Sequence, residues 1–546
     1  MNVTWARKLL ETFHANGVRE VVFCAGARNS PLVFVLEKAA GIEAYSFFEE
    51  RSAAFFALGI ARRTERPVAV ITTSGTAAAE LLPATIEAFH LGIPLLLVTA
   101  DRPKRLRGTG APQAIDQTGL FAKFIEHEYD LEMGELPQMR MWTRRQPLHV
   151  NVCFDEPLID EPIETFEIVG RTSAEEAADV LGRVRGASRS GLTASAEWAA
   201  LRLTRFLRSQ DPLLVVVGSL ESDDEREAVL RFLTKLRAPV YLEGTSGLRE
   251  RSELAPFALR SGDRILPWGL KEGALKRALR IGGVPTARIW RDLEEPSSHV
   301  EILSISPLPF AGLSRGEFLC AEIASALDGL GPIEVKPSNE TWFAKDRHAR
   351  EILESLYREF PKAEPSLFHT LSTVIPSNAH VYVGNSLPIR EWDLAASYDH
   401  ARAVEANRGV NGIDGQVSTF CGGAYTDREN WAIIGDLTAM YDLAGPWAIH
   451  QRSEPSLRLV VVNNGGGRIF GRIFKSSAFE NRHDFGFEHW AKQWKLGYEK
   501  WTSVPAKWSG RDKHVVIELV PDEEQTTLFW DRYDAIFAKS ETRGDA

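Results

Sequence analysis

Two motifs in the last third of the chain carry residue types able to bind a divalent metal and a phosphate group. The segments IIGDLTAMYDL at 433–443 and LVVVNNGGGRIF at 459–470 each place polar or glycine residues directly after an apolar, strand-like run. Asp436 and Asn464 are 28 positions apart, which leaves room for one helix and one returning strand, so both can lie at neighbouring strand ends. Carboxylate, amide and backbone carbonyl oxygens suit Mg²⁺ shared with a diphosphate. Either motif alone is equally compatible with an ordinary turn, whereas the ordered pair is more specific.

A third candidate is the pair of acids in SFFEERSAAFFALGIARR at 46–63. Glu49 and Glu50 precede an apolar run at 53–61, which predicts a helix that is buried on every face. Two interpretations stay open at this point. The acids are first-turn residues favoured by the helix dipole, or one of them is a partly desolvated carboxylate whose raised pKa permits proton exchange near neutrality.

The elements that must position these residues follow from alternating strand and helix patterns, which predict parallel sheets built from βαβ units. Helices are expected after Glu50, at 222–236, and over AAAELLPATIEAFHLG and MYDLAGPWAIHQ. Residues 171–197 are predicted to be a tether, and 332–346 a second boundary. Strands are expected in three successive sets: VVFCAG, PVAVITTSG and PLLLVTADRP; DPLLVVVGSL and APVYLEG; AHVYVGNS, RAVEANRG, NWAIIGDL, LRLVVVNNGGG and HVVIELV.

Length and composition exclude several classes of protein. A chain of 546 residues suggests about three domains. The net charge of −10 disfavours binding to a nucleic-acid backbone. Without a secretory signal or a run of about 18 apolar residues, a cytoplasmic protein with no membrane span is expected. Four cysteines show no CxxC spacing and are expected to be reduced and mostly buried: Cys24, Cys153, Cys320 and Cys421.

The Gly-Asp motif followed by Asn-Asn resembles the signature of thiamine-diphosphate enzymes. Nearly the whole chain also resembles the 2-succinyl-5-enolpyruvyl-6-hydroxy-3-cyclohexene-1-carboxylate (SEPHCHC) synthase family of menaquinone biosynthesis. The resemblance implies α/β architecture with three doubly wound parallel-sheet domains: pyrimidine-binding at 1–180, central at 198–335 and diphosphate-binding at 345–546. Its blocks stand in family order: CAGARNSP, EERSAAFFALG, TSGTAAAE, TADRP, GAPQAIDQ, GNSLPIR, NRGVNGIDG, GDLTAMYDL and NNGGGRIF.

The family's activity implies that 2-oxoglutarate loses CO₂ and that the succinyl unit adds to isochorismate, with thiamine diphosphate and Mg²⁺ or Mn²⁺ as cofactors. It also implies a homodimer or a dimer of dimers with active sites at the subunit interface. Two alternatives are another thiamine-diphosphate-dependent 2-oxo-acid decarboxylase or carboligase, and a non-catalytic cofactor-binding protein. The combination of Glu50 with Asp436 and Asn464 weighs against the second, because cofactor binding alone does not need a proton-transfer glutamate.

The resemblance assigns roles residue by residue. Asp436, Asn464 and the Gly466 carbonyl match the metal ligands, and Glu50 matches the glutamate that holds N1′ of the cofactor's aminopyrimidine. The remaining cofactor-binding matches are Ile413, Gly435, Leu437 and Ile469.

Both substrates carry several carboxylates, which planar arginine side chains bind in a bidentate manner. Ser386 and Arg390 are assigned to the distal carboxylate of the succinyl unit. Isochorismate is assigned to Arg28, Arg102 and Arg408, and Gln113 is a neutral hydrogen-bonding partner. The apolar residues beside the reacting centre are Ile469 and Phe470.

Several positions depart from the family pattern. Ala25 and Ala27 replace a proline and a serine, which removes a hydroxyl near the second substrate. Only Arg288, before Ile289, stands where the family often has a Lys-Arg or Ser-Lys pair. Gly465 replaces the third asparagine of an NNNGG motif, and this change costs little if the metal is held by Asn464 and a backbone carbonyl.

Overall fold

The computed structural model describes residues 1–168, 194–287, 289–295, 299–334, 336, 340–399, 402, 404–474, 476–510 and 512–542. These residues form two compact units. Unit 1 contains the described residues of Met1–Ala187 together with Asn407–Thr426 and Thr438–Pro455. Unit 2 contains those of Ser188–Ala406, Asp427–Leu437 and Ser456–Ala546.

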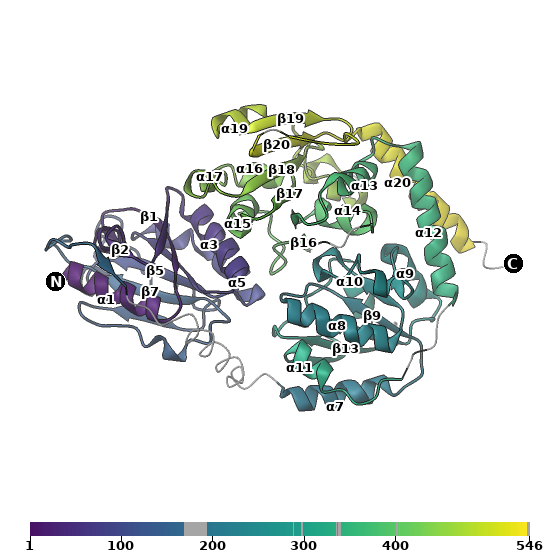
Figure 1. Cartoon of the computed structure of the whole chain (residues 1–546), viewed down its shortest axis with the longest axis horizontal. Coiled ribbons are helices and arrows are strands. Elements are labelled where there is room, and N and C mark those ends of the chain that lie inside the picture. Colours follow the sequence, from purple (N-terminus) through teal and green to yellow (C-terminus); the bar gives the residue numbers. More distant parts are fainter. Residues whose placement is uncertain are drawn as a thin grey trace. The chain divides into compact units, whose positions relative to one another are not determined.

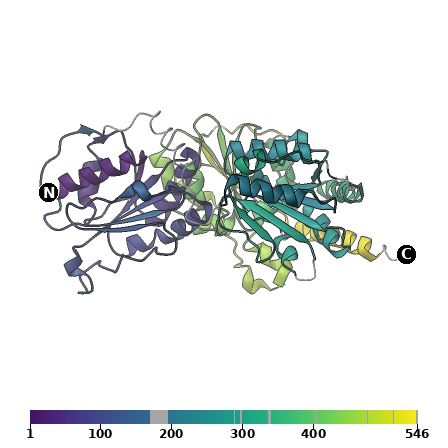
Figure 2. The same cartoon turned by 90° about the horizontal axis from the view of Figure 1, so that it is seen from below.

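Three six-stranded sheets organise the chain, and all of their strand pairs are parallel (Figures 1 and 2). If the strands of each sheet are numbered along the chain, the first and third sheets share the order 2-1-3-4-6-5. The middle sheet has the order 3-2-1-4-5-6. Both orders are doubly wound and reverse direction beside the first strand, which is where such sheets bind ligands. The predicted fold class is therefore confirmed.

The first sheet lies in unit 1. Helices α1 (Asn2–Ala15) and α2 (Ser30–Leu36) contribute to the apolar core on one face, and α3 (Glu50–Thr64) contacts β1 and β4. Two further helices are α4 (Thr76–Ala79) and α5 (Leu82–Leu91). The strands, in spatial order, are β3 (Glu43–Phe47), β1 (Glu20–Cys24), β4 (Val68–Thr72), β5 (Leu95–Asp101), β7 (Leu148–Cys153) and β6 (Glu128–Leu131); β2 (Ala39–Ala40) pairs with β8 (Phe166–Glu167) outside this sheet.

The middle sheet lies in unit 2 and has helices on both faces. Alternate residues of β9 (Leu213–Val217) point to opposite faces, so Val215 and Leu214 belong to different cores. One core includes α7 (Ala196–Leu207), α8 (Asp223–Leu236) and α11 (Ile323–Asp328); the other includes α9 (Gly262–Lys271) and α10 (Ile289–Glu294). The other strands are β11 (Ala258–Leu259), β10 (Val240–Leu242), β12 (Arg277–Ile281), β13 (Glu301–Ser306) and β14 (Glu317–Cys320).

The third sheet also lies in unit 2. Apolar residues of α13 (Glu364–Val374) and α14 (Leu387–Ala395) pack in one core with alternate residues of the central strands. In spatial order the strands are β16 (Val404–Glu405), β15 (His380–Val383), β17 (Glu429–Gly435), β18 (Ser456–Val462), β20 (His514–Leu519) and β19 (Gly497–Trp501). The remaining helices of the last third are α12 (Glu340–Glu359), α15 (Gln416–Gly423), α16 (Asp436–Tyr441), α17 (Trp447–Gln451), α18 (Gly471–Phe474), α19 (Glu488–Gln493) and α20 (Glu523–Thr542).

Two long predicted helices are each divided in the structure. AAAELLPATIEAFHLG forms α4 and α5, with a break at residues 80–81, because Pro83 favours a new helix start and cannot donate a backbone hydrogen bond. MYDLAGPWAIHQ forms the end of α16 and then α17, with Gly445 and Pro446 in the break. Most of the predicted tether, and Arg288, lie outside the described residues, whereas α7 begins at Ala196, within the predicted tether.

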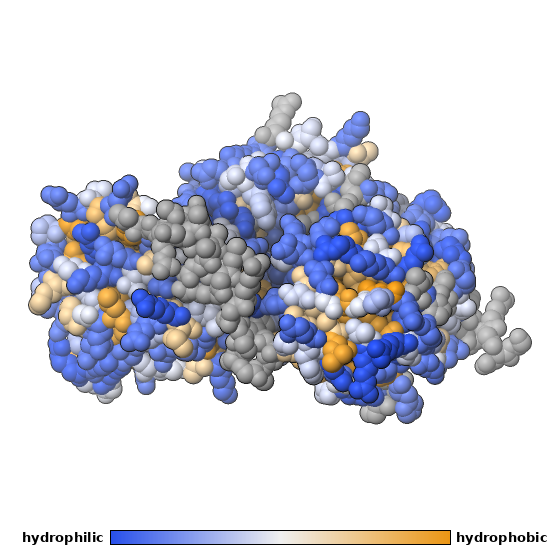
Figure 3. All heavy atoms as spheres, turned by 60° about the horizontal axis from the view of Figure 1, so that its bottom comes forward, coloured by the Kyte–Doolittle hydropathy of each residue, from blue (hydrophilic) through white to orange (hydrophobic). Residues whose placement is uncertain are grey.

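The cysteines and the polarity of the surface are as expected for a globular protein of this composition. All four cysteines are free and buried, as predicted. Hydrophilic residues predominate on the face drawn in Figure 3, with hydrophobic patches between them. Across the described ranges, every helix is too short or too polar to cross a bilayer.

Candidate active site

The carboxyl ends of two adjacent strands of the third sheet carry the predicted metal motifs. β15, β17 and β18 are neighbours, and Gly435 at the end of β17 pairs in register with Val462 at the end of β18. Asp436 directly follows β17, and Asn464 lies two residues beyond the end of β18. The prediction that the two motifs lie at neighbouring strand ends is confirmed.

Asp436 is a rigidly held carboxylate. The residue is 2% exposed, Oδ1 accepts a hydrogen bond from the Leu437 backbone N–H (2.6 Å), and Oδ2 accepts one from the Gly466 N–H (2.9 Å). His483 Nε2 lies 3.2 Å from the same Oδ2. Burial raises the pKa of Asp436, and the backbone N–H groups and His483 oppose this effect. The hydrogen bond to Gly466 ties the two motifs together.

Asn464 presents an oxygen suited to a metal. Its Oδ1 is buried and has no hydrogen-bond partner among the described residues. Its Nδ2 donates to Glu364, at 3.1 Å from Oε1 and 3.0 Å from Oε2. A buried polar atom without a partner is costly, and a bound cation would remove that cost. The donor set therefore fits an oxygen-liganded metal, although no group of three His, Cys, Asp or Glu side chains suited to a metal occurs in the described parts of the chain.

The loop after β18 has a backbone that only glycine can follow without strain. Gly466 has φ +132°, and a Cβ there would lie 2.4 Å from the Glu480 carbonyl oxygen. The loop continues into a 3₁₀ turn, Arg468–Phe470, in which Ile469 is partly buried and Phe470 is 40% exposed. Its conformation brings the Gly466 backbone against Asp436 and leaves Phe470 with an exposed ring.

Ser386 and Arg390 lie together just after β15. Ser386 precedes α14 with φ +71°, an uncommon conformation for a residue with a side chain. The Arg390 guanidinium donates to the Ser386 carbonyl oxygen, and Arg390 is exposed. Both residues therefore lie at the first strand of the sheet, where the strand order reverses.

In unit 1, the two acids before α3 have different environments. Glu49 is the N-cap of α3, and its carboxylate accepts hydrogen bonds from the Arg51 N–H (3.2 Å) and the Ser52 N–H (2.9 Å). Glu50 is the first helical residue and is half-buried. Burial raises the pKa of Glu50, with a further contribution from the negative charges of Glu49 and Glu80. Glu49 therefore caps the helix, whereas Glu50 lies in the first turn with a raised pKa and fits either interpretation.

Arg28, Arg102 and Gln113 gather near the carboxyl edge of the first sheet. Arg102 donates to Ser74 Oγ (2.8 Å) and to the Gln113 carbonyl oxygen (2.7 Å), and Gln113 Nε2 donates to the Ser74 carbonyl oxygen (3.1 Å). Burial lowers the pKa of Arg28, and the nearby charge of Arg102 lowers it further. The negative charges of Glu156, Asp155 and Asp101 oppose this lowering, and Arg28 Nη2 lies 3.6 Å from Glu156 Oε1.

The loop that carries Arg408 is held by a buried acid that the sequence did not single out. Glu87 is 2% exposed, and its carboxylate accepts hydrogen bonds from the Gly409 N–H (2.8 Å) and the Val410 N–H (2.9 Å). Ile413, farther along this loop, is partly buried. Burial raises the pKa of Glu87, and the positive charge of Arg408 opposes that rise.

The predicted residues are thus distributed over both units. In unit 2, Gly466 contacts Asp436, and Asn464 stands two residues before Gly466 in the same loop. The neighbouring strand β15 leads to Ser386 and Arg390. Sequence reasoning missed Glu364, His483 and Glu87. None of these three residues stands in a recognisable motif. Glu364 alone gave a signal in the sequence, since it is an acid at the start of a helix.

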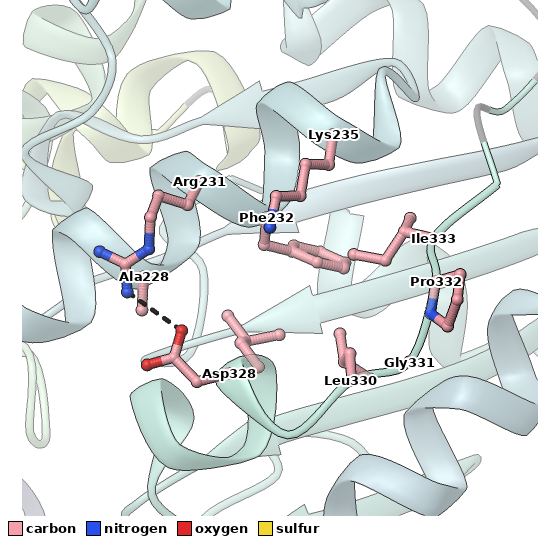
Figure 4. Close-up of a pocket in the computed structure, with 10 residues that line it drawn as sticks. Ala228, Arg231, Phe232, Lys235, Asp328, Leu330, Gly331, Pro332 and Ile333 are labelled. Atoms are coloured by element: carbon pink, nitrogen blue, oxygen red, sulfur yellow. Dashed lines mark hydrogen bonds and ion pairs between the residues drawn. The ribbon is translucent and has the colours of Figure 1, made fainter.

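A separate pocket of about 220 Å³ lies beside α8 in unit 2 (Figure 4). Aliphatic side chains and Phe232 form much of its wall, and Arg231 pairs with Asp328 at 3.0 Å. None of the predicted site residues lines this pocket.

Comparison with known proteins agrees with the class that the sheets and the metal motif define. Residues 3–120 match the family described as "Thiamine pyrophosphate enzyme, N-terminal TPP binding domain". Thiamine pyrophosphate is another name for thiamine diphosphate. The match contains Arg28, Glu50, Arg102 and Gln113.

Full-length relatives define the family more narrowly. SEPHCHC synthase of Bdellovibrio bacteriovorus is 42% identical over 98% of this chain and 99% of its own length. The synthase of Akkermansia muciniphila is 36% identical over 96% of this chain and 97% of its own length. That of Geobacillus kaustophilus is 32% identical over 94% of this chain and 92% of its own length. The chain belongs to the SEPHCHC synthase family of thiamine-diphosphate enzymes.

Proposed function

We propose that this protein is a transferase that decarboxylates 2-oxoglutarate and adds the succinyl unit to isochorismate, giving SEPHCHC and CO₂ in menaquinone biosynthesis. The observation that carries this proposal is the 42% identity to a SEPHCHC synthase over 98% of the chain. The geometry agrees with it, since the third sheet pairs a carboxylate and an unpartnered amide oxygen at adjacent strand ends.

Thiamine diphosphate, when bound, supplies the electron sink that makes decarboxylation and carbon–carbon bond formation feasible. In our assignment, Asp436, Asn464 and the Gly466 carbonyl would hold the Mg²⁺ or Mn²⁺ that accompanies the diphosphate and would offset its negative charge. Glu50 holds the proton at N1′ of the aminopyrimidine, and its half-buried position raises its pKa, which favours the protonated form that this role needs. Gly435, Leu437, Ile413 and Ile469 are assigned to contact with the cofactor.

Substrate recognition is assigned to fixed cations and hydrogen-bonding groups. Ser386 and Arg390 bind the distal carboxylate of the succinyl unit. The isochorismate carboxylates are assigned to Arg28, Arg102 and Arg408, with Gln113 as a neutral partner. Support comes from the placement of Arg102 and Gln113 against Ser74, and from the positive charge of Arg102 near Arg28, which lowers the pKa of Arg28.

We also assign three domains to the chain, at 1–180, 198–335 and 345–546. The protein is proposed to form a homodimer or a dimer of dimers in the cytoplasm, in which a second subunit completes each active site. Exposed aromatic side chains next to the metal loop support a partner surface there. Phe470 stacks on Phe474 with ring centroids 6.0 Å apart, and Phe479 lies 4.5 Å from Phe474. Large exposed apolar clusters typically mark interaction sites.

Turnover with both substrates tests the proposal. The purified protein is supplied with Mg²⁺, thiamine diphosphate and 2-oxoglutarate, with and without isochorismate, and both CO₂ and the adduct are followed. We expect adduct formation and CO₂ release that rises with isochorismate. CO₂ release that is indifferent to isochorismate, with a simple aldehyde as the product, would instead identify another 2-oxo-acid decarboxylase.

A further inference from the structure

The side chain of Asn464 needs an external cue to present the correct end to a metal. The oxygen and the NH₂ group of an asparagine amide have nearly the same shape, so packing alone does not choose between them. Only the oxygen can coordinate a cation. A neighbour that accepts hydrogen bonds but cannot donate them fixes the NH₂ end and directs the oxygen to the opposite side.

Glu364 is such a neighbour. It is 2% exposed and stands at the first position of α13, one hundred residues before Asn464 in the sequence. Both of its carboxylate oxygens lie within hydrogen-bond distance of Asn464 Nδ2, at 3.1 and 3.0 Å. Burial raises the pKa of Glu364 to about 7, and the hydrogen bond from Asn464 opposes this rise, which favours the ionised form. With both oxygens facing the NH₂ group, the ionised carboxylate only accepts hydrogen bonds.

Glu364 is itself held in place by its surroundings. Its backbone N–H donates to Thr526 Oγ1 (3.0 Å), and the helix that it begins is anchored by the buried residues Leu367, Phe368 and Leu371. The opposite end of the Asn464 amide, Oδ1, is buried without a hydrogen-bond partner in the described residues. The amide is therefore oriented with its unused oxygen free for a ligand.

We infer that Glu364 is a positioning residue that orients Asn464 for metal binding and thereby sets the affinity for the metal and the cofactor's diphosphate. This inference rests on the proposed function, specifically on Asn464 as a metal ligand. Partners that orient metal ligands typically change metal affinity 10- to 100-fold when they are replaced. Glu364→Gln keeps the size of the side chain but offers an NH₂ group as well, so it no longer selects the orientation of the Asn464 amide.

The test measures binding rather than turnover. Binding of Mn²⁺ is followed by the loss of the free-ion electron paramagnetic resonance signal at a fixed concentration of thiamine diphosphate. The proteins are the parent, Glu364→Gln, Asn464→Ala, the double variant and Asp346→Asn. Asp346 is a matched control, because it is also 2% exposed and accepts two backbone hydrogen bonds, from Arg260 and Ser261, without contacting either motif.

We expect Glu364→Gln to weaken Mn²⁺ binding by about 10- to 100-fold, while Asp346→Asn binds like the parent. If Glu364 acts through Asn464, adding Glu364→Gln to Asn464→Ala has little further effect, because the two changes remove the same interaction. A purely structural role predicts instead that the two effects add. Thermal unfolding without metal shows whether each variant folds.

Parent-like Mn²⁺ binding by folded Glu364→Gln, or its full effect in the Asn464→Ala background, would overturn the inference while leaving the metal site intact. If Glu364→Gln does not fold, Glu364→Asp replaces it. The shorter carboxylate cannot keep both contacts, so weaker Mn²⁺ binding is expected and parent-like binding counts against the inference. If Asn464→Ala itself binds Mn²⁺ like the parent, the proposed metal site is wrong.

Discussion

Replacing Gly59 with alanine is expected to force α3 and α15 apart. A Cβ at Gly59 would lie 2.0 Å from the Thr419 carbonyl oxygen and 2.7 Å from the Gly423 nitrogen, and one at Gly422 would lie 2.1 Å from the Phe56 carbonyl oxygen. These neighbours are helix backbone and cannot rotate away. The helices must separate by about 1 Å before the closest contact reaches 3.0 Å.

The cost follows from overpacking and from helix propensity. Inserting a methyl group into a rigid interface typically costs about 1–3 kcal/mol, and we take the upper end because both neighbours are backbone. Alanine in a helix regains about 1 kcal/mol relative to glycine. The net loss of about 2 kcal/mol corresponds to a lowering of the melting temperature of unit 1 by roughly 4–8 °C.

Differential scanning calorimetry of the parent and of Gly59→Ala measures this loss. Gly331→Ala is the control, since a Cβ at Gly331 would have no atom within 4 Å and its backbone is not left-handed. Gly422→Ala should be similarly destabilising, and the double variant should lose less than the sum, because the first methyl group already separates the helices. A Gly59→Ala midpoint equal to those of the parent and of Gly331→Ala would refute the reasoning.

Three further predictions concern ionisable groups. Glu50→Gln should leave folding and metal binding intact but slow C2–H exchange of bound thiamine diphosphate by about 10²- to 10⁴-fold; unchanged exchange measured by NMR would remove the role given to Glu50. Asp436→Ala should lose the metal-dependent part of cofactor affinity, measured by fluorescence titration with and without Mg²⁺; if the parent shows no such dependence, the assignment fails. Burial raises the pKa of Glu225 from 4.5 to about 7, so the folded chain keeps a proton that the unfolded chain releases, and stability falls as the pH rises from about 4.5 to 7. Glu225→Gln should remove about 3 kcal/mol of this loss, as monitored by urea unfolding at several pH values; an identical pH dependence in both proteins would contradict it.

The sequence by itself determined the parallel α/β class and the placement of the metal motifs. Both follow from local patterns. Apolar runs of strand length end at Gly435 and Val462, and the carboxyl ends of parallel strands meet at one edge of a sheet. The placement of Asp436 and Asn464 at neighbouring strand ends was therefore predictable once the two strands were recognised, and the family motifs added the proposed roles of the arginines and Glu50.

Local patterns were less reliable where a helix had to stop. The apolar pattern continued through residues 80–81 and through Gly445, so it predicted one helix where the structure has two. In both cases a nearby proline removes a backbone donor, and that effect outweighs the apolar periodicity.

Only the tertiary structure decided which distant residues support the site. Glu364 contacts Asn464, which lies one hundred residues later in the chain, and His483 lies 3.2 Å from Asp436. The Glu87 carboxylate accepts a hydrogen bond from the Val410 N–H. An acid at the start of a helix is equally well explained by the helix dipole when only its sequence neighbours are known. The sheet topology brings α13 to the end of β18, and this proximity lets Glu364 act on Asn464 through two short contacts.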